Sequence, residues 1–166
     1  MDQLLINSGF PILSVLIFLP LAGAMLLVFV KSEQLCRYLT LVVTSLVALL
    51  SLRLIAGFDL TTAKFQFVEQ HSWIESFNIN YIVGVDGISI LLILLTTLIM
   101  PFCVLASWSY IKTRVQTFMV CLLIMETAMI GVFAALDFVL FYILWEAMLI
   151  PMYLLNIPST IMSLGG

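Results

Sequence analysis

Two glutamates, Glu126 and Glu146, stand out because each lies within a long run of apolar residues. Placing a charged side chain at the centre of a bilayer costs about 3 kcal/mol on insertion scales, so acids at such depths are rare and usually functional. An acid that can gain and lose a proton there is suited to moving protons across a membrane. Proton transfer is therefore the catalytic chemistry that these positions could supply, and it is favoured for Glu146 more than for Glu126.

The spacing of the two glutamates predicts that they lie at equal depth. Leu136 is ten residues after Glu126 and ten before Glu146, at a turn predicted for Leu136 and Asp137. At ~1.5 Å per residue, each acid is roughly 15 Å from this turn, near the middle of a hydrocarbon core about 30 Å thick. If the two acids face each other, repulsion and desolvation favour a proton on at least one. The alternative is that each stays neutral and hydrogen-bonds a neighbouring helix as a structural contact.

The composition indicates that lipid surrounds most of the chain. Of the 166 residues, 64% are hydrophobic and only 9% are charged, against about 45–50% and 25% in soluble domains. Apolar runs of about 20 residues can cross a bilayer as helices, whereas the strands of a membrane barrel alternate apolar and polar residues. We predict an all-α, polytopic transmembrane bundle of about five helices, at residues 10–30, 38–56, 88–110, 116–135 and 138–155.

Charged residues in the connections predict the orientation. Lys31 and Arg37 follow the first span, and Lys112 and Arg114 follow the third, so both connections are expected on the cytoplasmic or matrix side. The longest connection, residues 57–87, is rich in acidic residues and is expected to be an ordered surface loop on the opposite side. The N-terminus is then outside and the C-terminus on the cytoplasmic or matrix side.

Other polar residues have structural interpretations. Asp86 and Asp137 precede predicted helices and are expected to cap their N-termini. His71 has no second ligand at metal spacing and is expected to be solvated or packed. The three cysteines show no metal-binding or disulfide pattern, and so few charges give no support for nucleic acid as a partner.

Three stretches form a set that resembles a known family. They are Gly84-Val85-Asp86-Gly87-Ile88-Ser89, Leu95-Thr96-Thr97, and Leu136-Asp137 followed by Phe141-Tyr142 and Trp145-Glu146-Ala147-Met148-Leu149-Ile150-Pro151-Met152-Tyr153. With them the chain resembles the antiporter-like membrane subunits of respiratory complex I, NADH:quinone oxidoreductase, and most of all the branch called chain M or, in mitochondria, subunit 4.

The resemblance implies a proton-translocating subunit of a respiratory-chain enzyme that passes electrons from NADH to ubiquinone. Glu146 matches a fifth-helix glutamate that pairs with a lysine on a later helix, and Glu126 matches a fourth-helix acid. The expected partners are the other membrane-arm subunits and the lipid of a bacterial cytoplasmic or mitochondrial inner membrane. No cofactor and no direct NADH binding are expected in this chain, because the flavin and iron–sulfur clusters belong to partner subunits.

The resemblance covers residues 10–155 and does not extend into the tail, residues 156–166. The helix with the partner lysine is not in the sequence, so we expect the N-terminal part of a subunit, truncated or split by a frameshift, a divided gene or gene decay, and inactive alone. Two alternatives remain. One is a subunit of a related cation/proton antiporter or membrane hydrogenase, and the other is a non-catalytic remnant.

Overall fold

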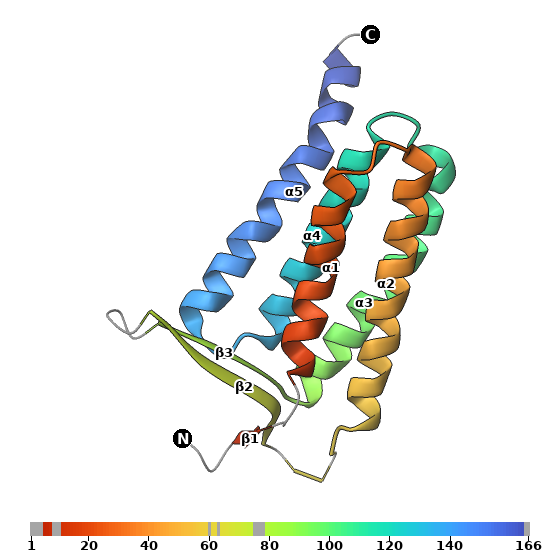
Figure 1. Ribbon diagram of the computed structural model, residues 1–166. Helices are drawn as coiled ribbons and strands as arrows, with labels where there is room; N and C mark the ends of the chain where they lie inside the picture. The colour runs from red at the N-terminus through yellow and green to blue at the C-terminus, as the bar shows by residue number, and fades with distance from the viewer. Residues whose placement is uncertain (1–4, 8–10, 60, 63, 75–78, 165–166) are drawn as a thin grey trace.

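The structure, a computed structural model, describes residues 5–7, 11–59, 61–62, 64–74 and 79–164. In this part of the chain five helices form a bundle, and a small sheet lies across one end of it (Figure 1). In chain order the elements are β1 (Leu5–Asn7), α1 (Ile12–Val28), α2 (Glu33–Ala56), β2 (Phe65–Ile74), β3 (Ile79–Val85), α3 (Gly87–Tyr110), α4 (Val115–Ala134) and α5 (Phe138–Leu164).

All five predicted spans are helical, and the helix bounds differ from the predictions mainly at two ends. Three helices, α2, α3 and α4, are long and apolar enough to cross a membrane, while α1 and the first 17 residues of α5 are shorter apolar helices. The helix α2 begins five residues before the predicted span because Ser32 accepts a hydrogen bond from the Leu35 N–H as its N-cap. The helix α5 continues to Leu164, past the end of the predicted span at residue 155.

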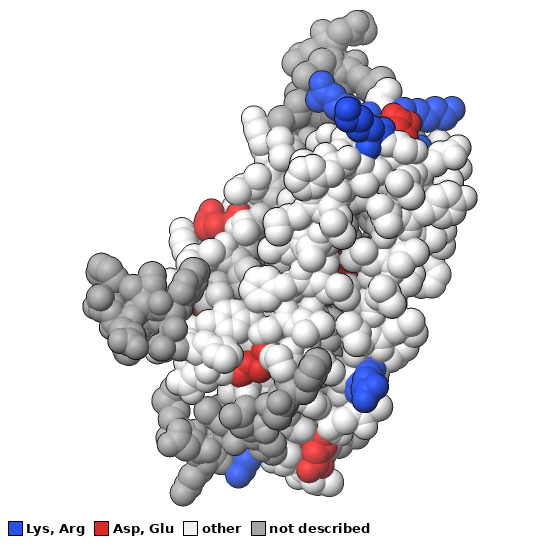
Figure 2. All heavy atoms as spheres, viewed as in Figure 1, with Lys and Arg blue, Asp and Glu red and all other residues white. Residues whose placement is uncertain are grey.

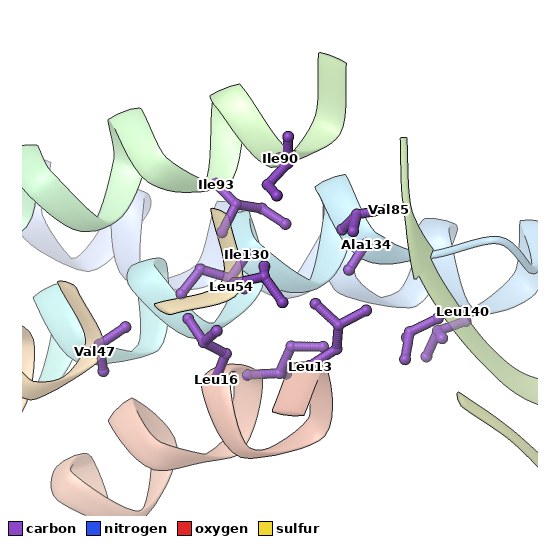
Figure 3. Packing of buried hydrophobic residues seen from close by; sticks show 12 residues of the cluster. Leu13, Leu16, Val47, Leu54, Val85, Ile90, Ile93, Ile130, Ala134 and Leu140 are labelled. Carbon is purple, nitrogen blue, oxygen red and sulfur yellow. The ribbon is translucent and has the colours of Figure 1, made fainter. Parts of the chain in front are cut away.

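The helix α4 is the centre of the bundle, because it contacts each of the other four helices. Buried apolar side chains form two clusters along the bundle. The first lies toward the sheet and joins side chains of all five helices and β3 (Figure 3), among them Leu13, Leu16, Val47, Leu54, Val83, Ile93, Ile130 and Leu140. The second lies toward the opposite end and includes Ala24, Leu27, Cys36, Met100, Val104, Met119, Leu122 and Leu123.

The expected surface loop contains a β-hairpin, which corrects the all-α prediction. Strands β2 and β3 pair antiparallel, and β1 pairs parallel with β2. Strand β2 was not predicted because its residues do not follow the two-residue alternation of a regular strand. Phe67 has a positive φ of 55°, and the register with β3 shifts between Gln66 and Glu69. The hairpin covers the end of the bundle, where the buried side chains of Val83 and Val85 join the first cluster.

Both predicted aspartate caps are confirmed. The Asp86 carboxylate accepts a hydrogen bond of 2.7 Å from the Ser89 N–H at the start of α3. The Asp137 carboxylate accepts hydrogen bonds of 2.9 and 3.1 Å from the N–H groups of Val139 and Leu140 at the start of α5. Each cap satisfies donors that the first turn of a helix leaves without partners.

The Asp86 cap predicts a pH-dependent contribution to stability. The hydrogen bond from Ser89 lowers the pKa of Asp86, so this contribution is complete above the unfolded value of about 3.9 and is lost as the pH falls through the lowered pKa. We expect Asp86→Ala to lower the free energy of unfolding by about 1 kcal/mol at neutral pH, and Asp86→Asn to retain most of the cap. Thermal unfolding in detergent between roughly pH 2 and 6 checks this. An Asp86→Asn protein with the same acid sensitivity as wild type would show that Asp86 is not the titrating group.

Basic residues gather at the end of the bundle opposite the hairpin (Figure 2). The α1–α2 and α3–α4 connections both lie there, and they or their flanks supply Lys31, Arg37, Lys112 and Arg114. The Arg37 guanidinium donates hydrogen bonds to the carbonyl oxygens of Trp108 and, at 2.7 Å, of Ile111, and it lies over the Trp108 ring. These contacts join the two connections at one end of the bundle.

Candidate functional site

Glu126 lies in the interior of the bundle, on the central helix α4. Its side chain is fully buried, and neither carboxylate oxygen has a hydrogen-bond partner among the residues that the structure describes. It is placed between the two apolar clusters, because Leu122 and Leu123 on its N-terminal side belong to the second and Ile130 on its C-terminal side belongs to the first. Burying an ionised carboxylate among these apolar side chains without a partner would be costly, because a charged group loses its hydration on burial.

The polar groups near this level of the bundle have partners of their own. Thr127 donates to the Leu123 carbonyl oxygen at 3.1 Å. Between α2 and α3, the buried hydroxyl oxygens of Ser51 and Thr97 lie 2.7 Å apart. Glu126 therefore differs from these hydroxyls, whose hydrogen-bonding demands are met locally.

Glu146 lies in a different environment, on the exposed side of α5. It is exposed on the surface of this chain and lines a groove of about 650 Å³ with α5 side chains that include Tyr142, Ile150 and Tyr153. Glu126 is therefore buried in the described part of the chain, and Glu146 is not. Glu146 would be shielded from lipid only if a side chain from another helix or another subunit packed over it.

The positions of both acids along their helices agree with equal depth. Glu126 is eight residues before the end of α4 at Ala134, and Glu146 is eight residues after the start of α5 at Phe138. The two helices are adjacent and joined by the predicted turn. Glu126 therefore lies in the bundle interior and Glu146 on its outer face, at a similar level along the bundle.

The structure also contains a polar site that the sequence analysis missed, formed by Glu69, Ser14 and Tyr81. The Glu69 carboxylate is 5% exposed and accepts hydrogen bonds from the N–H of Leu13 at 2.8 Å, the N–H of Ser14 at 3.1 Å and the Ser14 hydroxyl. Because the Ser14 hydroxyl donates to Glu69, the Tyr81 hydroxyl 2.9 Å away donates to Ser14. A carboxylate on β2 therefore caps α1, although 55 residues separate Ser14 from Glu69.

Tyr81 and His71 complete this site on the hairpin. Burial, and secondarily the nearby Glu69 carboxylate, raise the pKa of Tyr81, which keeps its hydroxyl protonated. His71 is exposed, and the centre of its ring lies 6.4 Å from that of Tyr81. In the described part of the chain, no group of three or more His, Cys, Asp or Glu side chains could hold a metal ion, and all three cysteines are free.

Comparison with known proteins gives one family and a consistent set of relatives. Residues 15–132 match the family model described as NADH-ubiquinone oxidoreductase chain 4, amino terminus. The chain is 44% identical over 150 residues to NADH-quinone oxidoreductase subunit M of Rhodobacter capsulatus, covering 87% of this chain and 29% of that protein. It is 44% identical over 138 residues to NADH-ubiquinone oxidoreductase chain 4 of Chondrus crispus, covering 82% and 28%. It is 41% identical over 143 residues to F(420)H(2) dehydrogenase subunit M of Methanosarcina mazei, covering 86% and 29%.

The chain therefore spans about three tenths of the length of the curated relatives it matches. The three long apolar helices and these relatives agree on a membrane location. The family match covers most of the sequence and includes Glu126, while the similarity to the relatives covers more than four fifths of the chain. On these findings, the chain belongs to the family of NADH-ubiquinone oxidoreductase chain 4, and it matches the amino-terminal part of that family.

Proposed function

We propose that the chain acts as the N-terminal part of a proton-translocating membrane subunit of NADH:quinone oxidoreductase, in which Glu126 and Glu146 transfer protons. The observation that carries the proposal is Glu126 on the central helix, a fully buried carboxyl group that has no hydrogen-bond partner in the described part of a chain of this family. A structural acid would be expected to use its hydrogen-bonding capacity, since an unpaired buried polar group costs free energy. A carboxyl group that transfers protons can lack a hydrogen-bond partner in one state of the transfer cycle.

Glu146 needs a partner that covers its exposed face. A cationic side chain from another helix or subunit would lower the cost of ionising Glu146 and would raise that cost again when it moved away. The movement of such a cation could therefore drive proton uptake and release at Glu146. Glu126, ten residues before the same turn, would exchange protons with this site when water enters between α4 and α5.

The proposed chain supplies proton movement and no electron transfer of its own. Flavin and iron–sulfur clusters would be held by partner subunits, and NADH would bind there. Energy would reach α4 and α5 through conformational change at contacts with neighbouring membrane subunits. The basic end of the bundle would face the cytoplasm or matrix, and the hairpin would face the opposite side, in keeping with the bias of basic loops.

A second candidate function is that of a subunit of a complex with a different electron donor. One relative, at 41% identity, is named a subunit of F(420)H(2) dehydrogenase, so this part of the sequence serves in complexes with different donors. The groups on this chain would have the same proton chemistry in either complex. The two candidates are separated by supplying membranes with NADH or with reduced F420 and recording which one drives proton movement.

Deletion of the gene tests the proposed function. Inverted membrane vesicles from a strain without this chain are expected to lose NADH-driven acidification by at least tenfold, and a plasmid copy is expected to restore it. Blue-native electrophoresis of the restored strain should show the tagged chain migrating with NADH dehydrogenase activity. Unchanged acidification in the deletion strain, with the tagged chain migrating apart from the enzyme, would favour a non-catalytic remnant.

A further inference from the structure

A cavity of about 660 Å³ lies between α1, α4 and α5, below the covering hairpin. This volume is within the range of about 300–1,000 Å³ that is typical of small-molecule sites. Most of its lining is apolar, with Ile17 and Leu21 from α1, Ile124 and Ala128 from α4, and Ile143 and Ala147 from α5. An apolar cavity of this kind does not retain water well and is suited to a hydrocarbon chain. A single flexible chain of methylene groups fits the size and the apolar lining of this cavity.

The end of the cavity near the hairpin is polar and aromatic. Ser14, His71 and Tyr81 line it, and the buried Glu69 carboxylate lies directly behind Ser14. The ring of Tyr81 lies 6.3 Å from that of Phe18 and 6.4 Å from that of His71, measured between ring centres. Aromatic faces and a carboxylate attract cations, and hydroxyl oxygens accept hydrogen bonds from an ammonium group.

Charge at this end of the bundle favours the same kind of ligand. The described residues near the hairpin end include four acids, Asp59, Glu69, Asp86 and Asp137, and two bases, Arg53 and Lys64. Four of the six basic residues, which would attract an anionic headgroup, lie at the opposite end (Figure 2). An ammonium group at the mouth of the cavity is therefore attracted, and a headgroup with net negative charge is repelled.

We propose that this cavity binds one acyl chain of phosphatidylethanolamine, with its ammonium group at the mouth formed by Ser14, His71 and Tyr81. The proposal does not depend on proton transfer by Glu126 or Glu146. The lipid would fill the space between α1 and α5 and hold both helices against α4. Its headgroup would link the hairpin to the start of α1.

Photo-crosslinking of the full chain in its own membrane tests the proposal. The probe is phosphatidylethanolamine with a diazirine in one acyl chain, and labelled peptides are identified by mass spectrometry. We expect labels on the α1, α4 and α5 residues that line the cavity. Leu21→Trp and Ala147→Phe each fill part of the cavity and are expected to reduce this labelling at least fivefold. Ala106→Phe, at an exposed position on α3 outside the cavity lining, is the matched control and should leave it unchanged.

Two comparisons separate this site from ordinary lipid contact. A phosphatidylglycerol probe with the same diazirine is expected to label the cavity at least fivefold less, because its headgroup is anionic. A phosphatidylcholine probe is expected to label it less than phosphatidylethanolamine, because its quaternary ammonium keeps the attraction to the aromatic rings but has no N–H donors. Equal labelling by all three probes, or equal labelling of wild type and the filled variants, would overturn the proposal. Absence of label from the cavity lining, with normal labelling of other faces, would also overturn it.

Discussion

Glu146→Gln is expected to lower NADH-driven proton translocation at least tenfold. Glutamine keeps the size and hydrogen-bonding capacity of the side chain but cannot take up a proton and release it at physiological pH. A tenfold loss corresponds to about 1.4 kcal/mol, a small part of what a missing proton site can cost. Because Glu146 is exposed on this chain, the substitution should leave the packing of the bundle intact.

One control variant and one further test variant show whether the loss comes from proton chemistry at this position. Glu33→Gln removes an exposed carboxylate in the first turn of α2, at the basic end, and should leave pumping unchanged. Glu126→Gln removes the other mid-bundle acid without changing its volume and is expected to reduce pumping as well. Inverted vesicles with a pH-sensitive dye give the rates, and blue-native gels confirm equal assembly. Full pumping by a normally assembled Glu146→Gln enzyme would disprove the catalytic assignment.

Glu69→Ala is expected to lower the free energy of unfolding by at least about 3 kcal/mol. The substitution removes a nearly buried carboxylate that accepts three hydrogen bonds at the start of α1, and hydrogen bonds to a charged group contribute about 1.5–3 kcal/mol each. The N–H groups of Leu13 and Ser14 then lose their partner, and α1 loses a negative charge at the positive end of its dipole. The hairpin should detach from α1 as a consequence.

Hydrogen exchange measures this effect where it arises. The amides of Leu13 and Ser14 should exchange at least tenfold faster in Glu69→Ala, while amides in the middle of α3 should change little. Glu69→Gln keeps one acceptor oxygen and should give an intermediate effect. Tyr81→Phe removes only the hydroxyl that donates to Ser14 and should cost about 1 kcal/mol. Unchanged exchange at Leu13 and Ser14 in Glu69→Ala would refute the role of Glu69 as the cap.

The helices were predictable from sequence because their signal is local. An apolar run of the length needed to cross a bilayer is read directly, and the caps at Asp86 and Asp137 follow from the residue type just before each run. Glu126 and Glu146 could be identified as candidate site residues for the same reason, since an acid within an apolar run is visible without any tertiary information. Their equal distance from the turn also follows from counting residues.

The hairpin and the Glu69 site were not predictable because they depend on contacts between distant residues. The two-residue alternation that reveals a strand is broken where Gln66 and Glu69 are both buried, and Phe67 adopts a left-handed conformation. No local pattern shows that Glu69 would accept hydrogen bonds from Leu13 and Ser14. The different environments of Glu126 and Glu146 were hidden for a related reason, because the spans are apolar on all sides and periodicity does not separate packed from exposed faces.

The most direct test of the central claim is infrared spectroscopy of the mid-bundle carboxyl groups in the assembled enzyme. Glu126 and Glu146 are proposed to hold exchangeable protons, so difference spectra between resting and NADH-driven membranes should contain protonated-carboxyl bands that shift in deuterated water. The account predicts that Glu126→Gln and Glu146→Gln each remove one such band, while Glu33→Gln removes none. Spectra in which both substitutions leave every carboxyl band in place would contradict it.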